Sequence, residues 1–214
     1  MRRAALVSLV LAASAAGAGA AQPRAEAERF PVLPVAFAVA EIDGQPVASP
    51  EWLAAQVDQA NAIFAPSGVS FQTADVHALA DAHARLETRR DRHALGAEVR
   101  PAVINCFVVV SLRDVDTPDR YRMGVHWRPR GHPGRHLVII TGTAGPTVLA
   151  HELGHFFGNH RHSETPNNIM SYARDGTVPP FFDDAQVSTI RRSARAFLRR
   201  GELVPAAVAR DSGG

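Results

Sequence analysis

The sequence predicts a mixed α+β domain with a twisted, mostly parallel sheet, a long backing helix and a second helix that carries paired histidines. Residues 50–64 bear apolar side chains at helical spacing and lie between two strand-like segments, as in a strand–helix–strand unit. Residues 102–112 are almost continuously apolar, which is typical of a central strand buried on both faces. The chain of 214 residues is long enough for one domain with a sizeable core.

The individual strands and helices are predicted from apolar patterns and from the turn residues between them. Five segments are predicted as strands: residues 32–42, 69–76, 102–112, 123–127 and 136–141. Three segments are predicted as helices: one from Ser49-Pro50 to the stop at Pro66-Ser67-Gly68, one from about Thr147, and one after the capping signal Asp183-Asp184.

Residues 78–100 are the part of the sequence that predicts least about structure. They are rich in Ala, Arg, Asp and His, and they fit either a helix or a long surface loop. The histidines in or beside this segment show no ligand spacing, so we expect His77, His83 and His93 to be surface residues.

Composition divides the chain into four parts. Residues 1–20 are typical of a signal peptide, because an arginine pair precedes a short apolar stretch and then small residues suited to cleavage. We expect a short flexible segment at residues 21–31, one folded domain at residues 32–205 and a disordered tail at residues 206–214. The signal peptide implies a secreted protein, either extracellular or periplasmic, and the export route stays open.

The charge balance gives no reason to expect nucleic acid as a partner. The 23 Lys+Arg residues are all Arg and stand against 21 Asp+Glu, so removal of Arg2 and Arg3 with the signal peptide leaves 21 against 21. No run of about 20 apolar residues follows the N-terminal stretch, so we expect no membrane span in the mature chain. No pattern specifies the oligomeric state, and we expect a monomer.

The second helix carries the most informative residues in the sequence. The stretch His151-Glu152-Leu153-Gly154-His155 places two histidines four residues apart, on one face of a helix. Two neutral imidazoles at this spacing can bind one Zn²⁺ with N–Zn distances of about 2 Å. The carboxylate of Glu152 is placed to take a proton from a water molecule that the metal activates.

This stretch resembles the signature of the metzincin clan of zinc peptidases, HExxHxxGxxH. Gly158 matches the glycine that ends the active-site helix in a sharp turn. Residues 168–172 (NIMSY) resemble the clan's Met-turn, in which a methionine, here Met170, lies beneath the metal. The resemblance implies a secreted, bacterial-type metallopeptidase with an upper subdomain at residues 32–158 and a small, helical lower subdomain at residues 159–205.

The sequence departs from the clan's signature at the third metal ligand. Arg161 stands where the resemblance expects a histidine, and arginine cannot ligate zinc because it stays protonated. His160 and His162 flank it, and either one could complete the metal site. We favour His162 over His160, because an extra residue in a loop costs little free energy whereas a shortened loop must stretch.

Two further features follow from the same resemblance. Tyr172 lies two residues after the methionine, where some metzincins place a tyrosine that stabilises the oxyanion; a packed aromatic residue is the alternative. Residues 123–127 are a candidate for the edge strand that pairs with extended substrate, although a purely structural strand fits them nearly as well.

Two other groups resemble metal ligands, but we predict no metal site at either. Cys106 lies in the apolar run of residues 102–112, so we expect a buried core thiol rather than a latency switch that ligates zinc. The acidic loop at residues 114–119 lacks the glycine and the distal glutamate of a calcium-binding EF-hand loop.

Together these patterns predict a secreted zinc endopeptidase that acts on peptides or proteins with one catalytic Zn²⁺ and Glu152 as general base. Two alternatives stay open at this point. Because Arg161 disturbs the third-ligand region, the chain could be a zinc-binding protein without catalytic turnover. It could also be a zinc amidase that acts on cell-wall peptides, since no residue pattern identifies the specificity pocket.

Overall fold

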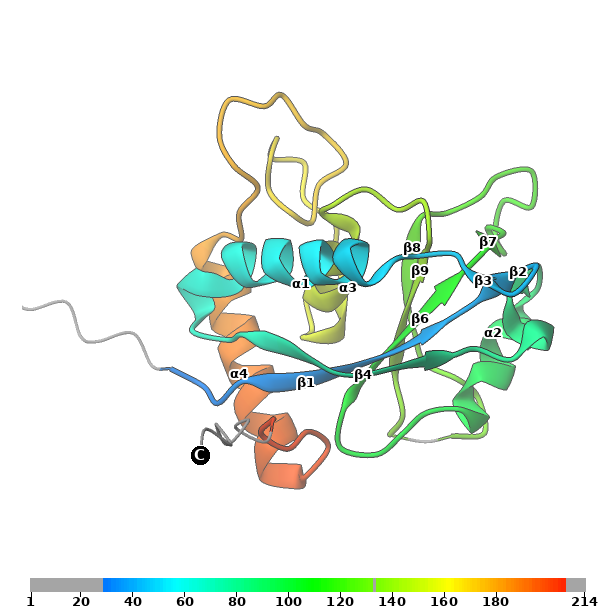
Figure 1. The fold of residues 1–214 in the computed structure, drawn as a ribbon. Helices are drawn as coiled ribbons and strands as arrows, with labels where there is room; N and C mark the ends of the chain where they lie inside the picture. Colours follow the sequence, from blue (N-terminus) through cyan, green and yellow to red (C-terminus); the bar gives the residue numbers. More distant parts are fainter. Residues whose placement is uncertain (1–28, 133, 207–214) are drawn as a thin grey trace, which may run out of the picture.

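The computed structural model describes residues 29–132 and 134–206, and a five-stranded sheet forms its centre (Figure 1). The spatial order of the strands is β4 (Phe71–Ala78), β1 (Leu33–Val39), β6 (Ile104–Val109), β9 (Leu137–Thr141) and β8 (Gly124–Trp127). Strand β1 pairs in parallel with β4 and β6, β6 pairs in parallel with β9, and only β8 runs antiparallel to its neighbour. The predicted α+β class with a mostly parallel sheet is confirmed.

Helices cover both faces of this sheet. Helices α1 (Pro50–Phe64) and α3 (Val148–Phe156) lie on one face, and α4 (Asp184–Arg200) packs beside them at one end (Figure 1). The segment that contains α2 (Arg89–Ala94) covers the opposite face. The remaining short elements are η1 (Ala65–Ser67), η2 (Asp81–His83), η3 (Leu95–Ala97) and the pairs β2 (Glu41–Ile42) with β3 (Gln45–Pro46) and β5 (Arg85–Leu86) with β7 (Ser111–Leu112).

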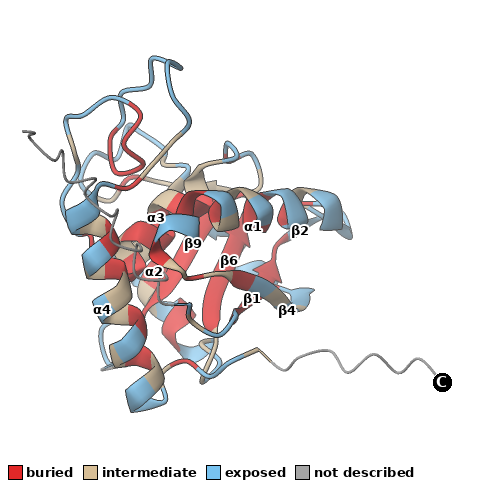
Figure 2. Ribbon diagram, turned by 90° about the vertical axis from the view of Figure 1, so that its left-hand side faces the viewer, coloured by how far each residue is buried: buried red, intermediate tan, exposed pale blue. Residues whose placement is uncertain are grey.

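Successive side chains of the central strands point to opposite faces of the sheet, so a hydrophobic cluster forms on each face. In β6, Cys106 and Val108 pack into the cluster beneath α1 and α3, whereas Phe107 and Val109 pack into the cluster on the other face. Figure 2 shows the central strands and the inner sides of the helices as buried. Each fully buried large apolar side chain contributes about 1.5–3 kcal/mol, so this double core anchors both α3 and the edge strand.

The caps of the two long helices lie where the sequence predicts them. Ser49 Oγ accepts a hydrogen bond from Trp52 N at 3.2 Å, and Pro50 is the first residue of α1. Asp183 caps α4 through a reciprocal capping box with Gln186. These caps satisfy N–H groups that have no partner within the helix.

Two predicted strands are wrong in extent. The first strand stops at Val39, and the chain then makes a separate β2–β3 hairpin around Asp43 and Gly44, which both have positive φ. The strand predicted at residues 102–112 begins only at Ile104, because Ala102 has a φ of 65°. Its last residues form β7, which pairs with β5 instead of continuing in the central sheet.

Residues 78–100 fold into short elements rather than one helix or one loop. A capping box between Thr88 and Asp91 starts α2, a local signal that sequence reasoning missed. His93 is half-buried rather than a simple surface residue, because its Nδ1 accepts hydrogen bonds from Trp127 Nε1 and from the backbone N–H of Arg130. His77 is exposed and pairs with Asp75.

Other expectations concern the ends of the chain and its relation to membranes. The predicted signal peptide and residues 207–214 of the predicted tail lie outside the described residues. Within the described ranges, none of the helices combines the length and the apolar character needed to cross a bilayer.

Cys106 is 1% exposed, as expected for a core thiol, and burial raises its pKa.

A pair of histidines, the half-buried His126 and the buried His136, joins the edge of the sheet to the end of α3. His126 Nε2 and His136 Nδ1 are 3.0 Å apart, and the His136 ring stacks on Phe156 with a centroid distance of 3.8 Å. Burial lowers the pKa of His126 to about 2 and that of His136 to about 4, with the nearby Arg128 acting in the same direction on both. Both rings are therefore neutral in the folded protein near neutral pH.

This pair predicts that the free energy of unfolding falls as the pH drops. Below about pH 6.5 these histidines take up protons in the unfolded chain but not in the folded one. Stability is therefore lost from about pH 6.5 down to about pH 4 through His136 and down to about pH 2 through His126. For His136 alone the loss is on the order of 3 kcal/mol at most. Urea unfolding at pH 7.5 and at pH 5 measures this fall in the free energy of unfolding.

The variant His136→Asn keeps a polar group near the position of Nδ1 and removes one titrating ring. Its free energy of unfolding should fall less than that of the wild type between these two pH values. The reason is that up to one proton fewer is taken up on unfolding. His83→Asn, in η2, is the matched control, because it makes the same substitution outside the His126–His136 pair. Equal pH slopes for His136→Asn and the wild type would contradict this assignment.

Candidate metal centre and cleft

Helix α3 presents two histidines on the side away from the core. Leu149 and Leu153 are fully buried against the sheet and α1, so the helix is held firmly on that face. His151 and His155 lie one turn apart on the other side, with ring centroids 4.8 Å apart. The predicted placement of both imidazoles on one helix face is therefore present in the structure.

Backbone carbonyl groups set the orientation of both rings. His151 Nδ1 is 2.7 Å from the Ile169 carbonyl oxygen, and His155 Nδ1 is 2.7 Å from the Asn159 carbonyl oxygen. A carbonyl oxygen can only accept, so each Nδ1 carries the proton and each Nε2 has a free lone pair. Burial lowers the pKa of both rings, to about 4 for His155, and both are neutral at pH 7.

The chain returns to these rings after a sharp turn at the end of α3. Gly158 has a φ of 98°, a backbone conformation that favours glycine, as the signature predicts. The return brings His162 to ring-centroid distances of 5.3 Å from His151 and 5.1 Å from His155. Candidate ligand atoms of these three histidines all lie within 4.8 Å of one another.

His160 and Arg161 lie on the two positions before His162 and are both exposed. His160 borders the same cleft, but among the described residues the cluster of potential metal ligands consists of His151, His155 and His162. The cluster contains His162, with the extra residue accommodated in the segment after Gly158, and the choice of His162 over His160 as metal ligand stays a prediction. The cluster supports a metal site that tolerates Arg161 at the expected ligand position.

Met170 lies directly beneath α3. Its side chain is fully buried, and a Cβ added at Gly154 would come within 2.5 Å of the Met170 sulfur. The side chain of Asn168 accepts a hydrogen bond from Met170 N at 2.9 Å and forms two hydrogen bonds with the Gln186 side chain. The turn at residues 168–172 is thus tied to the first turn of α4.

Arg174 holds the same turn from the other side, a role that the sequence does not indicate. Its guanidinium donates hydrogen bonds to four backbone carbonyl groups, those of Asn168, Ile169, Ser171 and Ala173. The Ile169 oxygen is also the acceptor for His151 Nδ1. Arg174 therefore supports the carbonyl that orients the first histidine.

Glu152 is buried beside the edge strand. Its side chain contacts β8 so closely that a Cβ added at Gly124 would lie 2.9 Å from Glu152 Oε1. Burial raises the pKa of Glu152 to about 8, against the opposing effects of a hydrogen bond from the backbone of His126 and the charge of Arg122. Gly124 is thus the small residue that makes room for this carboxyl group.

Tyr172 extends over the histidines from the turn. The side chain is 72% exposed, and its hydroxyl oxygen is 3.0 Å from His162 Nε2. Its ring is also stacked on that of His151, at a centroid distance of 5.9 Å. The hydroxyl group therefore lies at the mouth of the histidine cluster, where it can contact a ligand bound there.

These groups surround one open cleft of about 820 Å³. Its lining includes the three clustered histidines, Glu152, Tyr172 and the start of β8. The acidic loop at residues 114–119 borders it through Asp114, which pairs with Arg122 at 2.8 Å. A guanidinium thus already neutralises the charge of this carboxylate.

Comparison with known proteins reveals relatives only at the level of structure. No protein-family model and no curated protein matches the chain. Mirolysin, solved in complex with a compound, matches with a TM-score of 0.60 and 12% identity, over 83% of this chain and 100% of that chain. Metalloproteinase-II from Bacteroides fragilis matches with a TM-score of 0.52 and 12% identity, over 78% of this chain.

The chain spans about half of the second protein, since it covers 54% of that chain. Both matched proteins are metallopeptidases of the metzincin type, so the chain has the fold of that class. The metzincin resemblance inferred from the zinc helix and the Met-turn is confirmed for the fold.

The choice between His162 and His160 leads to a direct prediction. His162→Ala should weaken Zn²⁺ binding by at least about 100-fold, because it removes one of three clustered imidazoles. His160→Ala is the matched control and should bind Zn²⁺ within about threefold of the wild type. Competition with a chromogenic chelator measures both affinities, and the reverse ranking would assign the third ligand to His160.

Proposed function

We propose that this chain is a secreted zinc endopeptidase that hydrolyses peptide bonds in peptide or protein substrates. The observation that carries the proposal is the position of one buried carboxyl group, Glu152, next to a cluster of three histidines in an open cleft. The metzincin-type fold supports the same function, and the alternatives are not favoured.

The histidine cluster fits a zinc ion by its donor chemistry. His151 and His155 are neutral and present Nε2 lone pairs, and His162 adds a third imidazole within reach. Three histidines that leave one coordination position open are typical of catalytic zinc sites. A zinc ion held there would lower the pKa of a bound water molecule and polarise the carbonyl group of the substrate.

Glu152 is proposed as the general base. Its buried carboxyl group borders the cleft, and the positive charge of a bound zinc ion would favour its ionised form despite the burial. In that form it can take a proton from the attacking water and later deliver it to the leaving amine. Tyr172 is proposed to donate a hydrogen bond from its hydroxyl to the oxygen that becomes negative in the transition state. Its exposed position at the mouth of the cluster supports this second role.

The edge strand β8 offers a binding site for an extended peptide. One side of β8 is paired with β9, while its residues Gly124 to His126 also line the cleft. A substrate that adds to this edge by backbone hydrogen bonds would pass directly beside Glu152, because Gly124 touches that side chain. We therefore propose residues 124–127 as the backbone platform for the substrate.

The alternative functions differ in what they require of Glu152. A zinc-binding protein without turnover would not need a carboxyl group buried next to the histidine cluster, which is why catalysis is the better proposal. A zinc amidase on cell-wall peptides would use the same residues on another substrate. Cleavage assays on casein and on mixed peptides, with and without a chelator, distinguish the three.

Replacement of Glu152 tests the proposed mechanism. Glu152→Ala should keep Zn²⁺ binding within about threefold and reduce kcat for peptide hydrolysis by about 10²–10⁴-fold, since it removes only the general base. Glu98→Ala changes an exposed glutamate and serves as the control with wild-type activity. Zinc content and turnover are measured on the same preparation, and an active Glu152→Ala variant would refute the assignment.

Export is proposed from the pattern of residues 1–20 alone. When the full chain with a C-terminal tag is expressed in a bacterial host, the protein recovered outside the cytoplasm should begin near Ala21 by mass spectrometry. Replacement of the apolar residues Leu9, Val10 and Leu11 by Gln should keep it inside with an uncleaved N-terminus. Wild-type protein that stays uncleaved in the cytoplasm would contradict the proposal.

A further inference from the structure

Arg122 forms part of the cleft wall immediately before the edge strand. Its backbone N–H donates to the Leu112 carbonyl at 2.8 Å. The same two segments are also joined where the Asp114 N–H donates to the Arg120 carbonyl at 2.8 Å. These hydrogen bonds fix the backbone that carries Arg122.

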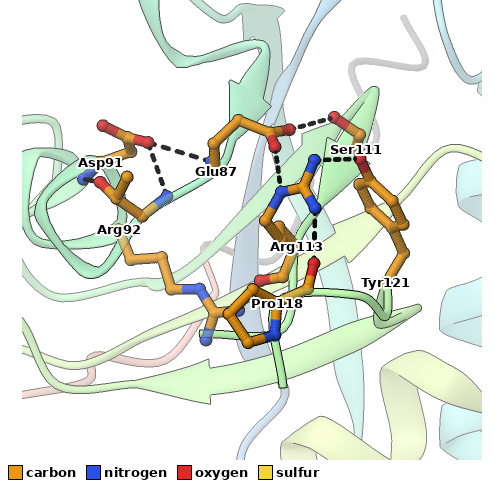
Figure 3. Close-up of polar contacts among 8 residues, drawn as sticks. Glu87, Asp91, Arg92, Ser111, Arg113, Pro118 and Tyr121 are labelled. Atoms are coloured by element: carbon orange, nitrogen blue, oxygen red, sulfur yellow. Dashed lines mark hydrogen bonds and ion pairs between the residues drawn. The ribbon is translucent and has the colours of Figure 1, made fainter. Parts of the chain in front are cut away.

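A second arginine locks the loop that precedes Arg122. Figure 3 shows the Arg113 guanidinium between Glu87, the Pro118 carbonyl and the Tyr121 hydroxyl. The distances are 2.5 Å to Glu87 Oε2, 2.5 Å to the Pro118 oxygen and 2.7 Å to the Tyr121 oxygen. With three partners on two sides of the loop, Arg113 keeps this wall of the cleft in one conformation.

Asp114 orients Arg122 and has little capacity left for a ligand. Its side chain is only 7% exposed, and Oδ2 is 2.8 Å from Arg122 Nη2. Its Oδ1 accepts hydrogen bonds from the backbone N–H groups of Asp116 and Thr117. The Arg122 side chain, in contrast, is 41% exposed and can offer further donors of its fork to the cleft.

The charges around the cleft favour an anionic substrate. Among the described residues that line it, the cationic side chains are Arg120, Arg122 and Arg174, and the acidic ones are Asp114 and Glu152. Asp114 is paired with Arg122, and Arg174 donates hydrogen bonds to backbone carbonyl groups. A positive surplus therefore remains on the wall that a substrate would face.

The position of Arg122 along the edge strand indicates which part of a substrate it would meet. It precedes Gly124 by two residues, a span of about 7 Å in extended chain. Gly124 touches Glu152, and Arg122 lies close to the Tyr172 hydroxyl. A peptide along β8 would thus place a residue near Arg122 within about two residues of the bond at Glu152.

We infer that Arg122, held in position by Asp114, binds a substrate carboxylate within two residues of the scissile bond, so that the cleft selects acidic peptides. This inference rests on the proposed peptidase function. A guanidinium and a carboxylate form strong, charge-assisted hydrogen bonds, and a neutral or cationic side chain gains nothing there. The carboxylate is supplied either by an Asp or Glu side chain or by the free C-terminus of a short peptide.

The test uses the zinc-loaded mature protein and quenched fluorescent peptides that differ at one position near the cleaved bond. Sets with Glu, Gln or Lys at each position from two residues before to two residues after the bond are compared, with free and amidated C-termini. We expect kcat/KM to be about tenfold higher for Glu than for Gln at one of these positions, and lowest for Lys. The advantage should shrink as ionic strength rises.

Arg122→Gln should bring the ratio of kcat/KM for Glu and Gln peptides to about 1, and Arg122→Lys should give an intermediate ratio because it keeps the charge but not the fork. Arg128→Gln removes the same charge outside the cleft lining and should keep the wild-type ratio. Thermal unfolding checks that each variant is folded.

The outcomes separate the inference from the proposed function. If no peptide is cleaved by folded, zinc-loaded protein, the peptidase function fails. If peptides are cleaved with equal kcat/KM for Glu and Gln and with no gain from a free C-terminus, the peptidase stands and the role of Arg122 is wrong. A preference that survives in Arg122→Gln also overturns that role. A gain confined to free C-termini identifies the terminal carboxylate as the group recognised.

Discussion

The two hydrogen bonds from the His151 and His155 rings to backbone carbonyl groups are the constraint on which the whole site depends. They set the tautomer of each ring and turn each Nε2 toward the cleft. Because the acceptors belong to Ile169 and Asn159, the same bonds require the chain to end α3, turn at Gly158 and return beneath the helix. The geometry of the site is therefore inseparable from the path of the segment that follows α3.

The site also depends on two positions where a side chain packs directly against a glycine backbone. Gly154 lets Met170 pack under the helix, and Gly124 lets the Glu152 carboxyl group sit against the edge strand. At both positions a single added carbon would overlap its neighbour, so the surrounding atoms would have to move. The two glycines therefore allow α3 to pack closely against Met170 on one side and against β8 on another.

Much of this arrangement could be predicted because it depends on local patterns. Helical spacing and caps identify α1 and α4, and the spacing of His151 and His155 places them on one helix face. The ends of strands could not be predicted in the same way, since residues after Val39 pair with each other in the β2–β3 hairpin, which no apolar pattern reveals. The support from Arg174 depends on contacts between residues that no sequence spacing brings together.

The unpaired edge of β8 can also affect how copies of this protein interact with one another. Any extended chain can add to an unpaired strand edge, including a frayed terminus or a loop of another copy. At the opposite edge of the sheet, β4 carries the Asp75–His77 and Asp75–Arg100 ion pairs, which discourage such pairing. If β8 binds substrate as proposed, its edge must stay accessible. An extended segment of another copy that adds there would then lie beside Glu152, so self-association through this strand would become self-digestion.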